Sequence, residues 1–488
     1  CSIRAAVDEA AAATTPVVVH LGAGETHTLS LAGADDTNAG GDLDVRAAGG
    51  TVTLVAEAPG AAVVAPGSDG VIDVHEGTVR LVGVGASGAT GDGWRVRSGA
   101  VLLAEGATSH SNGGAGLAVD TGAVAVTTNV TLAGNGATYT NSTGVIDSYS
   151  AAAIKADSAI NITGGVVTTT SSGTGGKGLK SDGTITIGSI TGGPTLNITT
   201  TGARFQQSGS DYNHPKTIVA DGAISIVNGT TTLNSTDDGV HSKTSITISG
   251  GTHVIDAISP TQGVGEGVEA PIINFTGGTT SIVASNDGIN STYGTVPGGA
   301  EGNDGSQLNI SGGIIVAYGV DAIDANGDIT ITGGVTILDG RTNGPEEAID
   351  YNGTFLMNGG TLIAAGSNSN MTKAAGSAST QVNFFLKSSA ALASTSLLHI
   401  QDSSGSEVLT YKPRNNVYYF HVSTPALAKN AQYQVYYGGT YTGGSYVGGL
   451  SNNNTWGLLT GGTWSSTGAT LKKTFTTSST ATVNTQSF

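Results

Sequence analysis

The sequence has a single cysteine, Cys1, among 488 residues. One cysteine excludes an intrachain disulfide and a metal cluster built on several thiolates. Charged residues make up only 11% of the chain, and no lysine occurs before Lys155. The formal net charge is −17. A surface of that sign repels a phosphate backbone, so we expect no nucleic-acid partner.

Long apolar runs and aromatic residues are also scarce. No run of eighteen apolar residues occurs, so the sequence predicts no membrane span. Aromatic residues reach 5%, whereas 77 residues are glycine. Glycine costs about 1 kcal/mol inside a helix, while the abundant Thr, Val and Ile favour strands. The composition therefore predicts an all-β protein, and its Thr, Ser and Asn content is typical of extracellular or cell-surface proteins.

One sequence pattern is repeated through the middle of the chain. An acidic turn precedes a strand of alternating Ile and Thr, a Gly-Gly pair and a second strand. The Gly-Gly pairs begin at 250, 277, 312, 333 and 359, so the shortest repeat has 21 residues. That length holds about three short strands and leaves no room for a repeat helix. We predict a right-handed parallel β-helix, a solenoid that turns at Gly-Gly and stacks like residues about 4.8 Å apart. A β-sandwich or jelly roll is the alternative.

Three modules are predicted along the chain. Residues 1–140 form an N-terminal β-helix module, and apolar residues at helical spacing in 1–13 predict a short helix that caps the open end of the solenoid. Residues 141–374 contain the repeats. Residues 375–488 hold 15 of the aromatic residues, and strands at 397–401, 407–411, 417–422 and 432–437 predict a small antiparallel β module.

Residues 221–366, with their Asp-Gly-Val-His turns and Ile-Ser-Gly-Gly-Thr strands, resemble a bacterial family of secreted carbohydrate-binding β-helices, related in fold to pectate lyases. The resemblance extends over about 150–488, through 397–402 and 471–475. It implies binding of plant polysaccharides, pectin-like or cellulose-like, with calcium in the structure. Separately, residues 1–7 resemble the opening of CSLREA-type repeats of bacterial surface β-helices, except that Ala5 stands where glutamate is usual.

Stacked repeats would align the acidic turns in columns with neighbours about 5 Å apart. Carboxylates at that spacing repel one another unless a cation lies between them, and calcium prefers such hard oxygen ligands. We therefore predict calcium between the repeats, although acidic turn residues in water explain the same pattern and both interpretations remain open. The predicted calcium ligands are Asp238, Glu266, Glu269, Asp287, Asp321, Asp324, Glu347 and Asp350.

Sugar binding favours aromatic rings beside polar groups. The predicted carbohydrate-binding residues are Tyr293, Tyr318 and Tyr351 near the acidic turns, with Lys177 and Lys180, which take the column positions in earlier repeats. A second aromatic group at 436–464 is either a sugar platform or the core of the C-terminal module.

These patterns favour an extracellular polysaccharide-binding protein assisted by calcium, with no catalytic residue assigned. The alternative is a structural subunit that joins end to end into a filament or sheath, with residues 471–488 pairing on a neighbour's edge. A third interpretation is a uronate polysaccharide lyase. Cys1 is either a lipid-anchored first residue or the start of the CSLREA-like motif.

Overall fold

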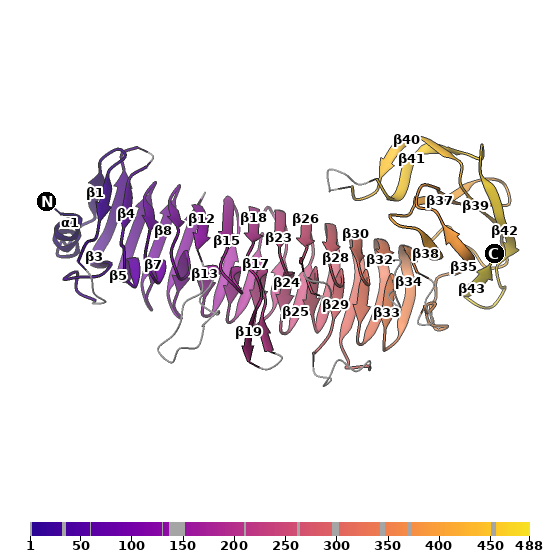
Figure 1. Cartoon of the computed structure of the whole chain (residues 1–488), viewed down its shortest axis with the longest axis horizontal. Coiled ribbons are helices and arrows are strands. Elements are labelled where there is room, and N and C mark those ends of the chain that lie inside the picture. Colours follow the sequence, from indigo (N-terminus) through magenta and orange to yellow (C-terminus); the bar gives the residue numbers. More distant parts are fainter. Residues whose placement is uncertain are drawn as a thin grey trace. The chain divides into compact units, whose positions relative to one another are not determined.

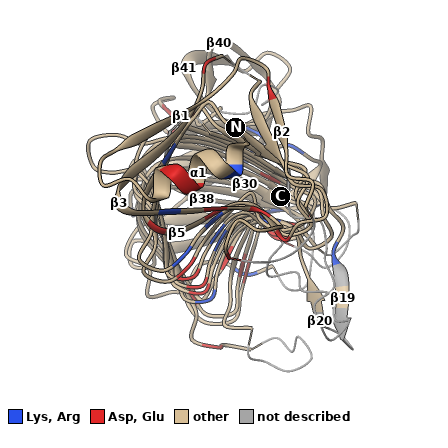
Figure 2. Cartoon of the chain, turned by 90° about the vertical axis from the view of Figure 1, so that its left-hand side faces the viewer, with Lys and Arg blue, Asp and Glu red and all other residues tan. Residues whose placement is uncertain are grey.

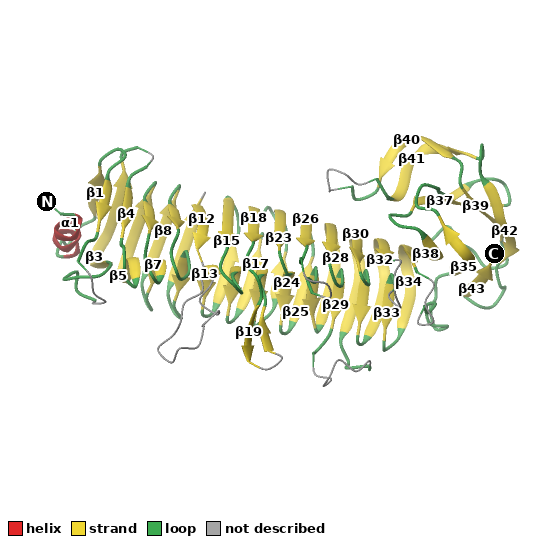
Figure 3. Ribbon diagram, viewed as in Figure 1, coloured by secondary structure: helices red, strands yellow, loops and turns green. Residues whose placement is uncertain are grey.

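The computed structural model describes every residue except 1, 32–35, 59, 129, 136–151, 209–210, 261–263, 295–301, 342–346, 368–371 and 450–454. Cys1 and the junction at 140/141 between the first two predicted modules therefore lie outside the described residues. The regular secondary structure of the described chain is β-strand apart from one helix, α1 (Ile3–Ala11), coloured red in Figure 3. No helix in this part of the chain has the length and hydropathy of a membrane span.

The chain forms two compact units. Unit 1 comprises residues 1–224 and 229–241, and unit 2 comprises 225–228 and 242–488. This division falls within the predicted module 141–374, at neither of its ends. In each unit, strands run parallel to the equivalent strands of the neighbouring repeats, visible as rows of arrows in Figure 1.

A first set of parallel strands carries the turns with charged residues. In unit 1 it contains β1 (Val17–Leu21), β3 (Leu43–Ala56), β5 (Gly70–Val82), β7 (Asp92–Val96), β8 (Val101–Glu105), β10 (Leu117–Val119), β11 (Val124–Thr128), β13 (Ala152–Ala156), β16 (Lys177–Ser181), β21 (Lys216–Ala220) and β24 (Asp238–Ser242). In unit 2 it contains β27 (Val268–Ala270), β29 (Ile289–Ser291), β31 (Ile323–Ala325) and β33 (Ile349–Tyr351).

A second set carries the Ile/Thr strands. Its shorter strands are β2 (Thr26–Thr28), β4 (Ala62–Val64), β6 (Gly85–Ser87), β9 (Thr108–His110), β12 (Val130–Asn135), β14 (Ala159–Ile162), β15 (Val166–Ser171), β17 (Thr184–Ile187), β18 (Thr195–Thr200), β22 (Ile224–Ile226), β23 (Thr230–Ser235), β25 (Ser245–Ile248) and β26 (Thr252–Ala257). In unit 2 the strands are longer and run through Gly-Gly: β28 (Ile272–Ala284), β30 (Gln307–Gly319), β32 (Asp328–Gly340) and β34 (Phe355–Gly366).

The helix α1 forms for reasons visible in its sequence. Ser2 accepts a hydrogen bond from the N–H of Ala5 at 3.2 Å and so caps the first turn. Ile3, Val7 and Ala10 are buried on one face, as their helical spacing predicts. Figure 2 shows α1 lying across the end of unit 1, where it packs against β3 and β1.

Like residues stack between neighbouring repeats of unit 2. Ile273 pairs with Leu308, Leu308 with Ile329 and Ile329 with Phe355, and all four side chains are buried. Each of these contributes roughly 1.5–3 kcal/mol relative to an exposed side chain. The second glycine of each pair has a positive φ, from 77° at Gly278 and Gly334 to 90° at Gly251. The predicted in-register stacking and the glycine turns are therefore confirmed within this unit.

The C-terminal part of unit 2 changes to antiparallel pairing. A six-stranded sheet has the order β40 (Thr440–Tyr446), β41 (Gly457–Ser465), β37 (Glu407–Lys412), β36 (Leu398–Asp402), β39 (Gln432–Tyr437), β42 (Thr470–Thr476). Three of the four predicted strands lie in it. The fourth, β38 (Val417–Ser423), does not join this sheet as predicted; it pairs with β34 and with β35 (Asn383–Leu392). Six of its seven residues are buried, so it belongs between other layers, where it also covers the edge of β34.

Residues 471–488 are used within unit 2. Strand β42 pairs with β39, and β43 (Val483–Ser487) pairs with β35 in parallel. A last pair of strands, β19 (Phe205–Ser208) and β20 (Asp211–Asn213), forms an antiparallel hairpin inserted between two repeats of unit 1. Tyr212 lies on this hairpin.

Candidate functional site

The predicted acidic columns exist within unit 2. Glu269 pairs with Asn290, Asn290 with Asp324 and Asp324 with Asp350 in the parallel register of β27, β29, β31 and β33. Three positions earlier in each repeat stand the acids of the first column, Glu266, Asp287, Asp321 and Glu347. The fifth predicted member, Asp238, lies in unit 1.

Two of the first-column carboxylates, those of Asp287 and Asp321, accept hydrogen bonds from backbone N–H groups. Asp287 Oδ1 accepts a hydrogen bond from the N–H of Asp321 at 3.3 Å, and Asp321 Oδ1 accepts one from the N–H of Glu347. These two acids each satisfy a backbone donor of the next repeat, which is a turn-forming role of acidic residues, whereas Glu266 accepts a hydrogen bond from the side chain of Asn286 at 3.4 Å. Among the described residues of unit 2, no three acidic or histidine side chains bring one ligand atom each within 4.8 Å of one another.

The second column leaves one polar atom without a partner. Asn290 is 8% exposed, and its buried Oδ1 accepts no hydrogen bond from any residue that the structure describes. The neighbouring Oδ1 of Asp324 is buried as well. At the end of the column, Lys373 donates a hydrogen bond to Asp350 Oδ1 at 3.2 Å. The second column therefore offers an orphaned oxygen acceptor beside carboxylates.

The two predicted lysines lie in a buried polar cluster of unit 1. Lys177 pairs with Lys216 in the register of β16 and β21, and Lys180 pairs with Lys155 of β13. Lys177 is 4% exposed and donates a hydrogen bond to the carbonyl of Gly175. The other ammonium groups contact carboxylates, Lys180 with Asp182 and Lys216 with Asp238.

Nearby charges and burial shift the pKa values of two members of this cluster. Burial, together with the nearby Lys216 and Lys180, lowers the pKa of the Lys177 ammonium to about 7. Burial raises the pKa of Asp237, which is 2% exposed, although its hydrogen bond from His214 opposes that rise. His214, Asp237 and Asp238 hold one ligand atom each within 4.8 Å of one another.

An aromatic and cationic surface lies at the border of this cluster. The guanidinium carbon of Arg204 lies 4.6 Å from the centre of the Tyr212 ring. The ring of Tyr212 meets the ring of His214 edge on, with centroids 6.4 Å apart. His214 Nδ1 lies 3.0 Å from Asp237 Oδ2, and Lys216 Nζ lies 3.3 Å from the ring nitrogen of His241. We call Arg204, Tyr212, His214, Lys216, Asp237 and Asp238 the hairpin site.

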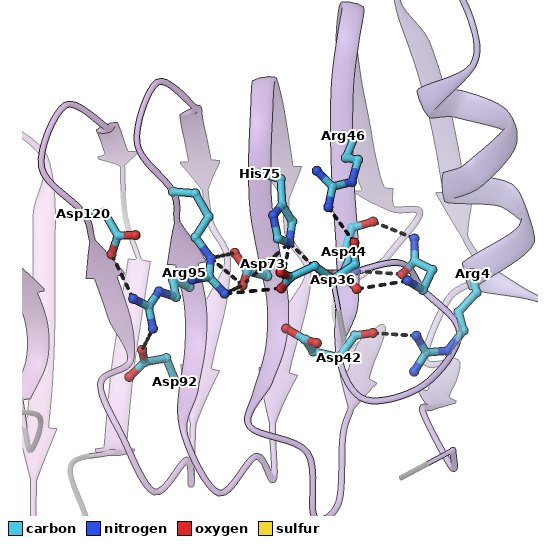
Figure 4. A network of polar contacts seen from close by, with 12 residues as sticks. Arg4, Asp36, Asp42, Asp44, Arg46, Asp73, His75, Asp92, Arg95 and Asp120 are labelled. Atoms are coloured by element: carbon cyan, nitrogen blue, oxygen red, sulfur yellow. Dashed lines mark hydrogen bonds and ion pairs between the residues drawn. The ribbon is translucent and has the colours of Figure 1, made fainter. Parts of the chain in front are cut away.

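The register position that Lys155 and Lys180 share carries charges of both signs at the N-terminal end of unit 1. Asp44 pairs with Asp73, and Asp73 pairs with Arg95. His75 contacts Asp44 at 2.6 Å, and the Nε of Arg97 donates to both oxygens of Asp73 at 2.9 and 3.0 Å (Figure 4). These charges neutralise one another across repeats, so we assign this network a structural role.

The three predicted tyrosines do not form one platform. Tyr293 follows β29 and is 46% exposed. Tyr318 lies on β30, in the second set of strands, with the Arg414 guanidinium 3.8 Å from its ring centre. Tyr351 ends β33, where its hydroxyl donates a hydrogen bond to the carbonyl of Ala374 at 2.7 Å. Their role in sugar binding stays a prediction.

Sequence reasoning assigned neither Tyr212 nor His214 to a binding site. A signal was present, because Phe205 and Tyr212 are the only aromatic residues between 152 and 274, and both fall in a segment that interrupts the repeat. Insertions in a repeat protein commonly carry its binding residues. The aromatic group at 436–464 is divided: Tyr437 and Trp456 are buried in the core of unit 2, whereas Trp464 stacks on His399 with centroids 3.7 Å apart.

Comparison with known proteins gives one match, to a family model. No curated protein and no solved structure matches the chain significantly. Residues 174–260, which contain the hairpin site, match a family model described as carbohydrate-binding domain-containing protein. This segment is similar to that family and supports carbohydrate binding as the broad function.

Proposed function

We propose that this protein is an extracellular polysaccharide-binding protein whose binding surface is the hairpin site of unit 1. One observation carries the proposal. Within the segment that matches the carbohydrate-binding family, the only two aromatic residues lie on the inserted hairpin, and Tyr212 is fixed there between Arg204 and His214.

The proposed architecture is a right-handed parallel β-helix closed by a helix and a C-terminal β module. In-register parallel pairing, buried ladders of Ile and Leu, and positive-φ glycines at each turn support it. A regular stack of this kind holds exposed side chains at fixed spacing, as binding to a repeating polymer requires.

The hairpin site has the chemistry that a sugar ring needs. An aromatic ring packs against the apolar C–H face of a pyranose, and a guanidinium donates hydrogen bonds to its hydroxyl oxygens. His214 is anchored by Asp237, so its ring is preorganised. Lys216 and Asp238 pair with each other behind it, which limits the motion of the surface and lowers the entropy cost of binding.

Calcium is proposed to bind along the second column of unit 2, near Asn290 and Asp324. The buried, unpartnered Oδ1 of Asn290 supports the proposal, because an amide oxygen and carboxylates are ligands that calcium accepts. The ion would offset repulsion between stacked acids. No catalytic step is proposed.

Binding of the full chain to insoluble pectin and cellulose, followed by calorimetry with soluble oligosaccharides, tests the function. Tyr212→Ala should weaken binding about tenfold, since a ring stacked on an aromatic side chain contributes on the order of 1–3 kcal/mol. Tyr212→Phe keeps the ring and should bind nearly as well as the unmodified protein.

The matched control is Tyr418→Ala, which removes a half-buried tyrosine of unit 2. It should leave binding unchanged. Equal affinities for Tyr212→Ala and the unmodified protein would show that the hairpin site is not the binding surface. Absence of binding to every polysaccharide tried would remove the proposed function itself.

A further inference from the structure

A cavity of about 480 Å³ opens in the six-stranded sheet of the C-terminal part of unit 2. It lies within the range typical of small-molecule clefts, about 300–1,000 Å³. Its lining includes two tyrosines, two leucines, a threonine and a lysine: Tyr441, Tyr446, Leu397, Leu459, Thr395 and Lys412. None of the described residues that line it is acidic.

The two tyrosines are held in place before any ligand arrives. Tyr441 accepts a hydrogen bond from the N–H of Gly462 at 3.2 Å, and Tyr446 donates one to the carbonyl of Thr455 at 3.0 Å. Tyr446 also pairs with Leu459 across β40 and β41. Because hydrogen bonds fix both rings, binding would cost little side-chain entropy.

Lys412 has no charged partner of its own. It is half-buried at the end of β37, and among the described residues its ammonium makes no hydrogen bond, ion pair or cation–π contact. A partly desolvated ammonium favours an anionic group, and the cavity supplies none. The charge is therefore available to a ligand.

We propose that this cavity is a second sugar-binding subsite, which takes a pyranose unit carrying an anionic substituent, a carboxylate or a sulfate. The tyrosines and leucines contact the ring, the hydroxyl of Thr395 contacts sugar hydroxyls, and Lys412 binds the anion. This subsite goes beyond the proposed function, since it lies outside the segment that matches the carbohydrate-binding family and assigns Lys412 to the anionic group of the sugar.

Isothermal titration of the full chain with three probes tests the proposal: a galacturonate trisaccharide, a sulfated galactose trisaccharide and cellotriose. At least one acidic probe should bind more tightly than cellotriose, and which one binds identifies the anion. Lys412→Gln should weaken that binding at least tenfold, as expected for loss of a charge-assisted hydrogen bond. Lys472→Gln, a half-buried lysine of β42 at the other edge of the same sheet, should leave it unchanged.

Tyr446→Ala should also weaken binding of the acidic probe, while Tyr446→Phe retains most of the affinity. Circular dichroism of each variant checks that it folds. Equal affinity of Lys412→Gln and unmodified protein overturns the subsite, and so does a preference for cellotriose. The variant Tyr212→Ala distinguishes binding at the hairpin site from binding at this second subsite. If that variant abolishes all acidic-sugar binding while Lys412→Gln does not, the subsite fails and the function proposed above stands.

Discussion

The Nδ1 atom of His214 lies 3.0 Å from the Oδ2 atom of Asp237. The contact joins the end of the inserted hairpin to the acidic turn of the next repeat, with Asp237 buried and His214 partly exposed. The insertion is thereby fixed to the regular stack. His214 in turn meets the ring of Tyr212 edge on, so the contact with Asp237 helps to orient Tyr212, and such preorganisation favours binding.

Removal of this anchor should weaken polysaccharide binding without removing the aromatic ring. Asp237→Ala leaves His214 unheld, so we expect a loss of affinity of about tenfold, whereas Asp237→Asn keeps an acceptor for His214 and should lose at most a few-fold. Calorimetry with the best oligosaccharide checks this. Equal effects of the two substitutions would contradict an anchoring role.

Lys177 should destabilise the protein at neutral pH. Its pKa is lowered to about 7 in the folded state from the ordinary 10.5. Between those values the unfolded chain binds more protons than the folded one, so the contribution of Lys177 to stability rises with pH across that window and is least favourable below pH 7. Lys177→Met should therefore raise the free energy of unfolding at pH 6, by roughly 1–3 kcal/mol, and less at pH 10.

Denaturant melts at both pH values measure this difference. Lys243→Met, at an exposed lysine, is the control and should change stability little at either pH. A Lys177→Met variant less stable than the unmodified protein at pH 6 would mean that the hydrogen bond to Gly175 outweighs the burial of the charge.

Asp339 should make unit 2 less stable as the pH rises. Burial raises the pKa of Asp339 to about 7, against hydrogen bonds from Arg414 N–H at 2.7 Å and the Tyr411 hydroxyl at 3.1 Å. The folded state binds the extra proton between about pH 4 and pH 7, so stability falls through that window. Asp339→Asn retains an acceptor for both donors and should flatten the dependence, as melting temperatures at pH 4.5 and 8 will show. A variant curve parallel to that of the unmodified protein would exclude Asp339 as the source.

The glycine turns should tolerate substitution according to their surroundings. Gly334 has a φ of 77°, and a Cβ there would lie 2.7 Å from the carbonyl oxygen of Gly313. Gly405 has a φ of 88° but open space, and Gly192 has neither constraint. We expect the loss of stability on substitution with alanine to follow the order Gly334, Gly405, Gly192, with about 1 kcal/mol or more at Gly405 and a larger loss at Gly334. Urea melts rank the three.

Calcium should raise the melting temperature if it binds the second column. A chelator should reverse the shift, and magnesium should act weakly, because it demands a tighter octahedral shell. Asn290→Ala should reduce the calcium-dependent shift, and Tyr293→Ala, on a neighbouring exposed side chain, should not. A shift of the same size in Asn290→Ala would place the ion elsewhere.

Much of the repeat architecture was readable from the chain. The side chains of Ile273, Leu308 and Ile329 stack because a strand of alternating apolar and polar residues has only one face that can be buried. The same pattern in successive repeats places these apolar faces together. Gly278 and Gly334 turn the chain because only glycine takes a positive φ cheaply. The alignment of Glu269, Asn290 and Asp324 follows from the same register.

Other features could not be read in this way. The predicted strand at 417–422 exists but joins β34 and β35, since its choice of partner depends on which edge the preceding repeats leave exposed. Asp287 and Asp321 of the first column accept hydrogen bonds from backbone N–H groups of the next repeat, and only atomic positions reveal which donors they reach.

Local periodicity by itself determined the strands, their register, the glycine turns and the capping helix, because each depends on residues near one another in sequence or on exact repetition. The tertiary structure decided where Tyr212 meets Arg204 and His214, how Asp339 is buried beneath Arg414, and that Lys412 faces a cavity with two tyrosines. These contacts join segments that no repeat relates, and their geometry comes from the folding of an insertion and the packing of distant strands.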